Sequence, residues 1–178
     1  MIHIVTPCSR PEMLGFLRES IPAECKWTVM LDFSTSKSKI PKGINVIRSN
    51  VGGWFGHPLR NMAIDYLQTS ASHNDYVYFL DDDNIIHPDW YNAVKDCNED
   101  FVNWAQVYRN GQPRLNATES PRVGNIDTAS FMMKIGTIGK SRFQMAYEAD
   151  GLFAQAIYKN GTKQTINQYL CYYNYLRS

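Results

Sequence analysis

Three consecutive carboxylates, Asp81, Asp82 and Asp83, are the residues of this sequence whose types and spacing most directly indicate chemistry. They follow residues 76–80, an apolar run typical of a buried strand. Neighbouring carboxylates repel one another unless a cation joins them, and their oxygens suit hard cations such as Mn²⁺ and Mg²⁺. We therefore expect a Mn²⁺ or Mg²⁺ site here. The alternative is a solvated acidic turn, which the preceding apolar residues make less attractive.

A second pair of carboxylates, Glu148 and Asp150, opens a predicted helix over residues 148–158. Acidic side chains at a helix N-terminus are stabilised by the helix dipole, so capping alone would explain both. A carboxylate within hydrogen-bonding reach of a substrate hydroxyl could instead act as a general base. At this segment the residues alone leave capping and catalysis equally open.

The elements that must position these carboxylates alternate between strand and helix in the first half of the chain. Strands are predicted over residues 2–6, ended by Pro7, and over 27–33, 44–48 and 76–80; helices are predicted from Pro11 to Pro22 and over 59–67. This order favours a mostly parallel sheet with helices on its faces. Asp81 then lies beyond the carboxyl end of a strand, where open α/β sheets bind their ligands.

The second half of the sequence is less regular. We predict a helix over residues 88–97, strands over 101–108 and 125–133, the helix over 148–158 and an extended segment over 168–173. Because no repeat, low-complexity tract or linker interrupts the chain, we expect one domain over 1–178, with halves of about 1–84 and about 85–178.

Charge and hydropathy exclude some partners. Lys and Arg total 18 against 17 Asp and Glu, a net charge of +1, so we expect no nucleic-acid partner. We interpret the local basic cluster of Lys37, Lys39 and Lys42 as part of a solvated loop. No apolar run reaches the length of a membrane span and no signal peptide is evident, so we expect a cytoplasmic protein.

Several motifs occur in the order found in one enzyme family. They are Ile2-His-Ile-Val-Thr-Pro7, Trp27-Thr-Val-Met-Leu-Asp32, His57-Pro-Leu-Arg60-Asn61-Met-Ala63, Tyr78-Phe-Leu-Asp-Asp-Asp-Asn84, Ile126-Asp127-Thr-Ala-Ser-Phe and Glu148 followed by Leu152-Phe153. Over residues 1–160 the chain resembles nucleotide-sugar glycosyltransferases of the GT-A fold, in particular the glucuronyltransferase family. The run of three Asp and one Asn is similar to that family's form of the Asp-x-Asp motif. Without the family's membrane anchor and stem, the chain is similar to the small glycosyltransferase domain of chlorella viruses.

The resemblance implies a fold and a reaction. The fold is a GT-A type α/β domain, with a central, mostly parallel (mixed) sheet flanked by helices and a Rossmann-like nucleotide-binding half. The reaction is a metal-dependent, inverting transfer from a nucleoside-diphosphate sugar, expected to be a UDP-sugar, to a hydroxyl of a carbohydrate or glycan acceptor.

The resemblance also implies roles for residues of the donor side. Asp83, together with Asp81, would hold Mn²⁺ or Mg²⁺ against the diphosphate. Asp81 and Asp82 would contact the ribose, a metal-bound water or Arg60. Asp32 would contact the base, in a pocket lined by Thr6 and Pro7.

On the acceptor side the resemblance implies that Glu148 removes the proton of the acceptor hydroxyl, with Asp150 as the alternative base. Asp127 would orient the acceptor. Trp54 and Phe55 lie in a glycine-rich loop before the Arg60 helix, where they either anchor the loop by burial or serve as a substrate lid.

Two other functions use the same residues. A catalytically silent sugar- or nucleotide-binding module could have the same fold, because fold does not establish function. A metal-dependent phosphohydrolase or nucleotidyltransferase could also use Asp81, Asp82 and Asp83, although the sequence has no Walker-type phosphate loop.

Overall fold

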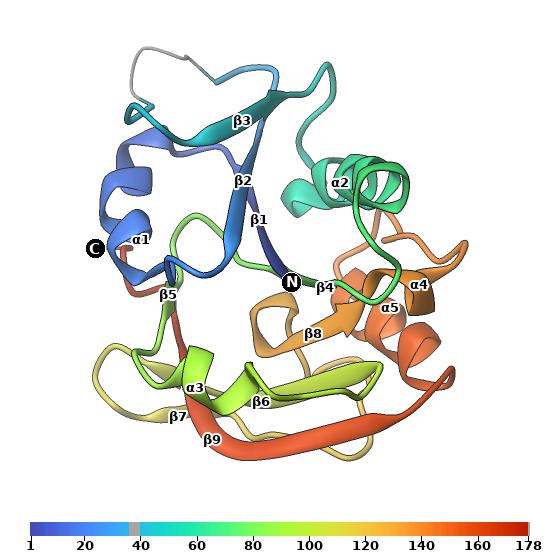
Figure 1. The fold of residues 1–178 in the computed structure, drawn as a ribbon. Helices are drawn as coiled ribbons and strands as arrows, with labels where there is room; N and C mark the ends of the chain where they lie inside the picture. The colour runs from blue at the N-terminus through green and yellow to red at the C-terminus, as the bar shows by residue number, and fades with distance from the viewer. Residues whose placement is uncertain (36–39, 178) are drawn as a thin grey trace.

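The computed structural model describes residues 1–35 and 40–177; Lys37 and Lys39 of the predicted basic loop lie outside the described residues. One mixed sheet of nine strands runs through the molecule (Figure 1). Its strands are β1 Ile2–Cys8, β2 Lys26–Leu31, β3 Asn45–Arg48, β4 Tyr76–Phe79, β5 Ile85–Ile86, β6 Phe101–Tyr108, β7 Pro113–Leu115, β8 Phe131–Lys134 and β9 Lys163–Tyr173.

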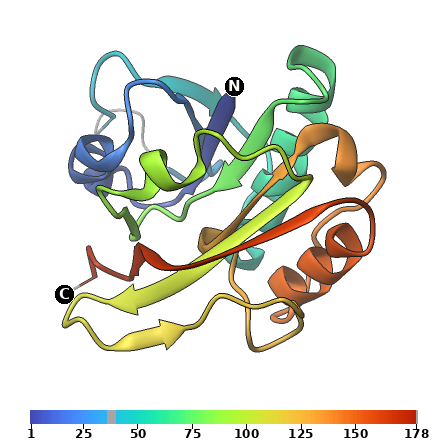
Figure 2. The same cartoon turned by 60° about the horizontal axis from the view of Figure 1, so that its bottom comes forward.

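The strands are ordered β3-β2-β1-β4-β8-β6-β9-β5, and β7 pairs with the outer part of β6. The first four strands of this path are parallel, as their crossover connections require. β8 is antiparallel to both β4 and β6, whereas β9 runs parallel to β6 (Figure 2). The predicted α/β class, with a central mixed sheet flanked by helices, is confirmed.

Helices cover both faces of this sheet. They are α1 Leu14–Ser20, α2 His57–Ser70, α3 Trp90–Val94, α4 Ile135–Ile138 and α5 Ala149–Tyr158, with 3-10 turns at Pro11–Met13, Trp54–Gly56 and Thr128–Ser130. Successive side chains of a strand point to opposite faces. On β1, Ile4 therefore packs in the apolar cluster beneath α1 and α3, and Val5 packs in the one beneath α2, α4 and α5.

The first strand does not end at Pro7, as the sequence predicted, but continues to Cys8. Leu80 N donates to Val5 O on the side of β4, and β4 pairs no further than Val5. Alternate residues of a strand direct their polar groups to the same neighbour, so the N–H that Pro7 lacks would face the side where β4 has already ended. Proline therefore costs no ladder hydrogen bond at this position.

The predicted strand over residues 125–133 was wrong in its first half. Asp127 there accepts a hydrogen bond from Ala129 N at 3.0 Å and begins a 3-10 turn over Thr128–Ser130, and Asp127 N donates to Ser130 Oγ at 3.1 Å. This reciprocal capping ends the extended backbone, and the strand starts at Phe131. Other boundaries moved less: the helix predicted over 88–97 is the shorter α3, and β9 begins five residues before the predicted 168.

Candidate functional site

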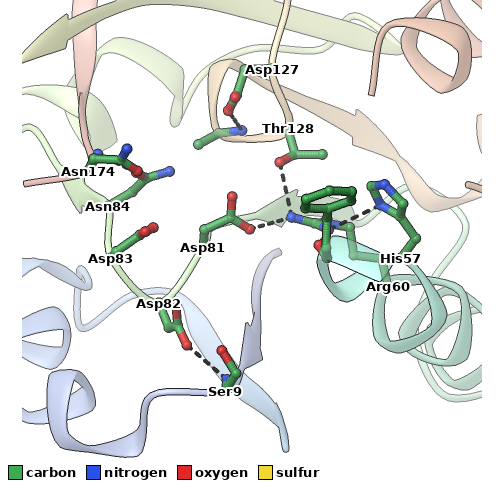
Figure 3. A network of polar contacts seen from close by, with 12 residues as sticks. Ser9, His57, Arg60, Asp81, Asp82, Asp83, Asn84, Asp127, Thr128 and Asn174 are labelled. Carbon is green, nitrogen blue, oxygen red and sulfur yellow. Dashed lines mark hydrogen bonds and ion pairs between the residues drawn. The ribbon is translucent and has the colours of Figure 1, made fainter. Parts of the chain in front are cut away.

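The three consecutive carboxylates diverge, and each binds an arginine (Figure 3). Asp82 is buried and points toward Ser9. It accepts hydrogen bonds from Ser9 N at 2.8 Å, Arg10 N at 2.9 Å and Arg10 Nε at 2.9 Å. Charge-assisted bonds of this kind are strong, so Asp82 fastens the loop after β4 to the loop after β1. Its observed role is to hold the two loops together.

Asp81 is bound by Arg60, which α2 buries to 2% exposure beneath the loop. This is one of the contacts that the resemblance implied. The same guanidinium donates to Phe55 O at 2.6 Å and contacts Thr128 Oγ1 at 3.3 Å. Burial raises the pKa of Asp81 to about 7 although Arg60 opposes the shift. Arg60 therefore connects the carboxylate to the glycine-rich loop and to the turn after Asp127.

Asp83 is paired with two cations from opposite ends of the chain. Its Oδ2 lies 3.0 Å from Arg10 Nη2 and 2.5 Å from Arg177 Nε. Both contacts are ion pairs, and neither is aligned as a hydrogen bond. The backbone of the C-terminal segment is fixed to the same loop, because Leu176 N donates to Asp83 O at 3.0 Å and Asn174 N donates to Asn84 Oδ1 at 2.8 Å.

Asp127 lies across from this loop in Figure 3. Its Oδ1 accepts from Ala129 N and from Gln106 Nε2, each at 3.0 Å, and its Oδ2 pairs with Arg114 Nη2 at 3.1 Å. Arg114 in turn stacks on Tyr173, 3.5 Å from the ring centroid. Asp127 is nearly buried and fully partnered by these neighbours, so an acceptor could reach it only by exchanging one of them.

Glu148 and Asp150 are placed differently. Glu148 is the exposed N-cap residue immediately before α5 and makes no capping hydrogen bond. Asp150 turns inward: its Oδ1 is buried without a hydrogen-bond partner among the described residues. Burial, together with repulsion from Asp127, raises the pKa of Asp150 to about 6 against the attraction of Arg60. α5 can pack closely against the loop at Val123 because residue 151 is a glycine: a Cβ there would lie 2.5 Å from Val123 Cα.

Four carboxylates, which we call the acidic cluster, influence one another electrostatically: Asp81, Asp83, Asp127 and Asp150. Within the described ranges no three Asp, Glu, His or Cys side chains converge into a complete metal site. Mg²⁺ in proteins commonly takes one or two carboxylates and completes its shell with waters and substrate phosphates. Asp83, with its unsatisfied buried oxygen, and Asp81 fit such a partial site.

The residues expected to contact the base are occupied within the protein. Thr6 is buried and its Oγ1 accepts from Trp27 Nε1 at 3.0 Å. Asp32 accepts from Ser34 N at 3.0 Å and Ser34 Oγ at 2.7 Å, and from Gly53 N at 3.0 Å. Pro7 is buried at the end of β1. The structure thus brings these residues to the carboxyl ends of β1 and β2, and their contact with a base stays a prediction.

Asp32 also fixes the glycine-rich loop. A Cβ at Gly52 would lie 1.8 Å from Asp32 Oδ2, so only glycine fits between the loop and this carboxylate. Beyond it Trp54 and Phe55 stay 60% and 66% exposed. Burial of these rings therefore does not anchor the loop; Asp32 and Arg60 do so through its backbone.

Sequence reasoning missed the arginines that balance the acidic cluster, Arg10, Arg114 and Arg177. A signal was present, because consecutive carboxylates need cations and the chain has 18 basic residues for 17 acidic ones. A cavity of about 970 Å³ lies elsewhere, between the end of α1, β5 and the C-terminal segment, with Phe16, Tyr91, Tyr172 and Leu176 in its wall. None of the predicted site residues lines it.

No family model and no curated protein matches this sequence. Among solved structures the chain is similar to 4-diphosphocytidyl-2C-methyl-D-erythritol synthase, with a TM-score of 0.57 and 13% sequence identity; the match covers 94% of this chain and 88% of that one. A likeness at this identity shows the fold. The chain therefore shares with that structure a Rossmann-like α/β fold, with a mixed sheet flanked by helices. Among the described residues, no helix has the length and apolar character needed to cross a membrane.

Proposed function

We propose that this protein is a metal-dependent glycosyltransferase that moves a sugar from a nucleoside-diphosphate sugar, expected to be a UDP-sugar, to a carbohydrate hydroxyl. The observation that carries the proposal is the acidic cluster, in which carboxylates from the loop after β4, the turn before β8 and α5 influence one another, with Arg60 paired to Asp81. It lies beyond the carboxyl end of β4, where sheets of this class bind nucleotides.

On the donor side, Asp83 and Asp81 would hold Mn²⁺ or Mg²⁺, which neutralises the charge that develops on a departing nucleoside diphosphate. Arg60 supports this by fixing Asp81 in position. Arg10 and Arg177 supply further positive charge beside Asp83. The protein residues thus provide a carboxylate pair for the cation and guanidinium groups next to it.

On the acceptor side the reaction needs a base, because a sugar hydroxyl is a poor nucleophile at neutral pH. The geometry favours Asp150 over Glu148, since Asp150 faces the acidic cluster while Glu148 is exposed outside it. A carboxylate with a pKa of about 6 is ionised at neutral pH and still accepts a proton readily. Asp127, in the turn before β8, would orient the acceptor hydroxyl.

A nucleotidyltransferase is the second candidate, and the fold match favours it. The matched structure is named as the synthase of a diphosphocytidyl compound, which contains a nucleotide. In nucleotidyl transfer the bond that breaks joins the α- and β-phosphates of a nucleoside triphosphate, and pyrophosphate leaves. In glycosyl transfer the sugar–oxygen bond breaks, and an intact nucleoside diphosphate leaves.

Product analysis separates the two reactions. The full chain is incubated with Mn²⁺ and either UDP-glucose, UDP-galactose or UDP-glucuronate together with a panel of methyl glycosides, or with CTP or UTP together with sugar phosphates. Release of UDP with formation of a disaccharide supports the proposed function. Release of pyrophosphate supports the second candidate, and nucleotide binding without either product indicates a silent binding module.

A further inference from the structure

We propose that Trp54, Phe55 and Tyr147, called here the aromatic rim, bind the acceptor saccharide by the apolar face of its ring. This inference rests on the proposed glycosyl transfer and names the surface that selects its acceptor. The three side chains are 60%, 66% and 83% exposed. Exposed apolar rings that gather in one place, unlike single ones, often mark a binding surface. Phe55 and Tyr147 meet edge to face, with ring centroids 5.9 Å apart.

The rim joins two segments that are far apart in sequence and firmly held. His57, at the start of α2, donates from Nε2 to Ala146 O at 3.1 Å. Burial and Arg60 lower the pKa of His57 to about 4, so the ring is neutral at physiological pH. Asn61 reinforces the junction: its side chain donates to Phe143 O at 2.9 Å and accepts from Phe143 N at 2.8 Å. The two segments that carry the rings are therefore held together by hydrogen bonds.

Each end of the rim is next to a group of the acidic cluster. The carbonyl of Phe55 accepts from Arg60 Nη1 at 2.6 Å, and the same guanidinium binds Asp81. Tyr147 stands three residues before Asp150, the favoured base. The backbone that carries Phe55 is thus tied to Arg60 and through it to Asp81, and Tyr147 is close to Asp150 along the chain.

The backbone of the rim is strained. Trp54 has φ 46° and Phe55 has φ 55°, the left-handed region that large side chains rarely adopt. Such strain costs about 1 to 2 kcal/mol per residue and tends to persist at functional sites. Since neither ring is buried, packing gained by the rings does not offset this cost.

A saccharide fits this combination better than other occupants. A pyranose presents C–H groups on its face and hydroxyls at its edge, so rings can take the face while neighbouring carboxylates take the hydroxyls. Three side chains offer far less area than the roughly 800 Å² per partner of a stable protein interface. A nucleobase would also stack, and Asp32, which is expected to contact the base, binds Gly53 N next to Trp54. The test therefore measures KM for the donor as well as for the acceptor.

The test measures acceptor and donor separately, using the methyl glycoside that the wild-type chain glycosylates fastest. Tyr147→Ala and Trp54→Ala should each raise KM for the glycoside about tenfold, the effect of losing one stacked ring. KM for the UDP-sugar and kcat should change less than twofold. Tyr147→Phe should behave as wild type, because the ring and not the hydroxyl makes the contact. Tyr66→Ala, which removes another exposed ring from α2, is the control.

A second variant separates binding from folding. Phe55→Gly relieves the left-handed strain, so it should raise Tm by roughly 2 °C while raising KM for the glycoside. Phe16→Gly is matched to it: Phe16 is 64% exposed but lies in helix α1, so its replacement should lower Tm and leave KM unchanged.

Three results would overturn the inference. Unchanged acceptor KM in both alanine variants would show that the rim does not bind the acceptor, while transfer by the wild type still upholds the proposed function. A rise in donor KM alone would assign the rings to the nucleotide. A fall in Tm for Phe55→Gly as large as that for Phe16→Gly would show that the ring stabilises the loop. If the wild type glycosylates no glycoside, the proposed function itself fails.

Discussion

Arg177 Nε lies 2.5 Å from Asp83 Oδ2, and Arg10 Nη2 lies 3.0 Å from the same oxygen. The carboxylate expected to hold a divalent cation thus already has two positive partners. A cation that binds Asp83 must approach or displace these guanidinium groups. Arg177 is the more exposed of the two, and ion pairs of exposed side chains contribute little to stability.

Arg177→Gln should therefore tighten the binding of Mn²⁺ alone, by about three- to tenfold, because it removes a competing charge at little cost to the fold. Calorimetric titration of the nucleotide-free protein with MnCl₂ measures this. Arg109→Gln is the control, since Arg109 stacks on Tyr175 of the same segment without pairing with Asp83. Equal Mn²⁺ affinity in wild type and Arg177→Gln would mean that Asp83 is not a ligand of the cation.

Asp83→Ala should abolish Mn²⁺-dependent binding of UDP while the protein stays folded. Arg10 keeps its bonds to Asp82, and Arg177 can turn to solvent, so the substitution leaves no buried cation without a partner. Calorimetry with UDP, with and without Mn²⁺, measures the binding, and circular dichroism checks the fold. Asp89→Ala, which removes an exposed carboxylate shortly after Asp83 in the chain, should change neither. Undiminished Mn²⁺ dependence in Asp83→Ala would reject the assignment.

Arg60→Met should destabilise the protein by about 1 to 3 kcal/mol, because it leaves the partly exposed Asp81 without its cationic partner. Adding Asp81→Asn should recover part of this loss, since the double variant no longer leaves a carboxylate unpaired. Urea unfolding of the wild type, both single variants and the double variant gives the coupling energy. Additive effects would mean that the pair does not act as a unit.

Asp150→Asn should lose glycosyl transfer by about 10² to 10⁴ while donor binding is kept, and Glu148→Gln should retain activity. A pKa of about 6 for Asp150 also predicts that kcat/KM of the wild type falls as the pH drops below 6, because the protonated carboxyl cannot accept a proton. Steady-state rates between pH 5 and 8 measure both effects. Loss of transfer in Glu148→Gln alone would return the role of base to Glu148.

The same group predicts a pH dependence of stability. The pKa of Asp150 is raised from 3.8 to about 6 by folding, so the folded protein binds this proton more tightly than the unfolded chain. The resulting stabilisation is complete below pH 4 and is lost as the pH rises through 6. Asp150→Asn removes this titration, so its free energy of unfolding should exceed that of the wild type at pH 8 by about 1 kcal/mol.

The extra free energy of unfolding of Asp150→Asn over the wild type should shrink as the pH falls toward 4. Urea unfolding at both pH values tests it, with Glu148→Gln as the control for removing an exposed carboxylate from the same helix start. A gain of the same size at pH 4 and pH 8 would show that Asp150 does not titrate as its surroundings imply.

The local pattern of apolar residues correctly predicted elements whose apolar residues recur with a clear period. β6 has the predicted bounds of 101–108, and α5 differs from its predicted helix by a single residue. Both are apolar stretches with a clear period. β5 and β7 were missed because strands of two or three residues carry no such pattern. The predictions at Pro7 and Asp127 failed for a different reason. Whether a strand continues through Pro7 depends on where the neighbouring strand ends, and the start of β8 depends on the capping pair of Asp127 and Ser130.

The candidate site was predictable in its acids and not in its contacts. Asp81 and Asp83 share one loop, whereas Asp127 and Asp150 come from two other segments, and the sequence could indicate each of the four as a candidate. Whether Glu148 or Asp150 faces inward depends on how α5 packs against the loop at Val123, which spacing does not encode. The arginine partners are likewise supplied by distant segments, one of them at the far end of the chain.

The placement of β9 affects how the chain acquires its structure during synthesis. This strand lies between β6 and β5 in the sheet although it is made last of all the described strands, and it pairs along the whole length of β6. While the polypeptide emerges from the ribosome, β6 keeps one unpaired edge, which can pair with other chains. The strands β1, β2, β3, β4, β8 and β6 can pair before residues 163–173 are made, whereas the second edge of β6 is covered only by those residues. Slow translation would therefore lengthen exposure of the β6 edge, and a chaperone that covers it should improve the yield.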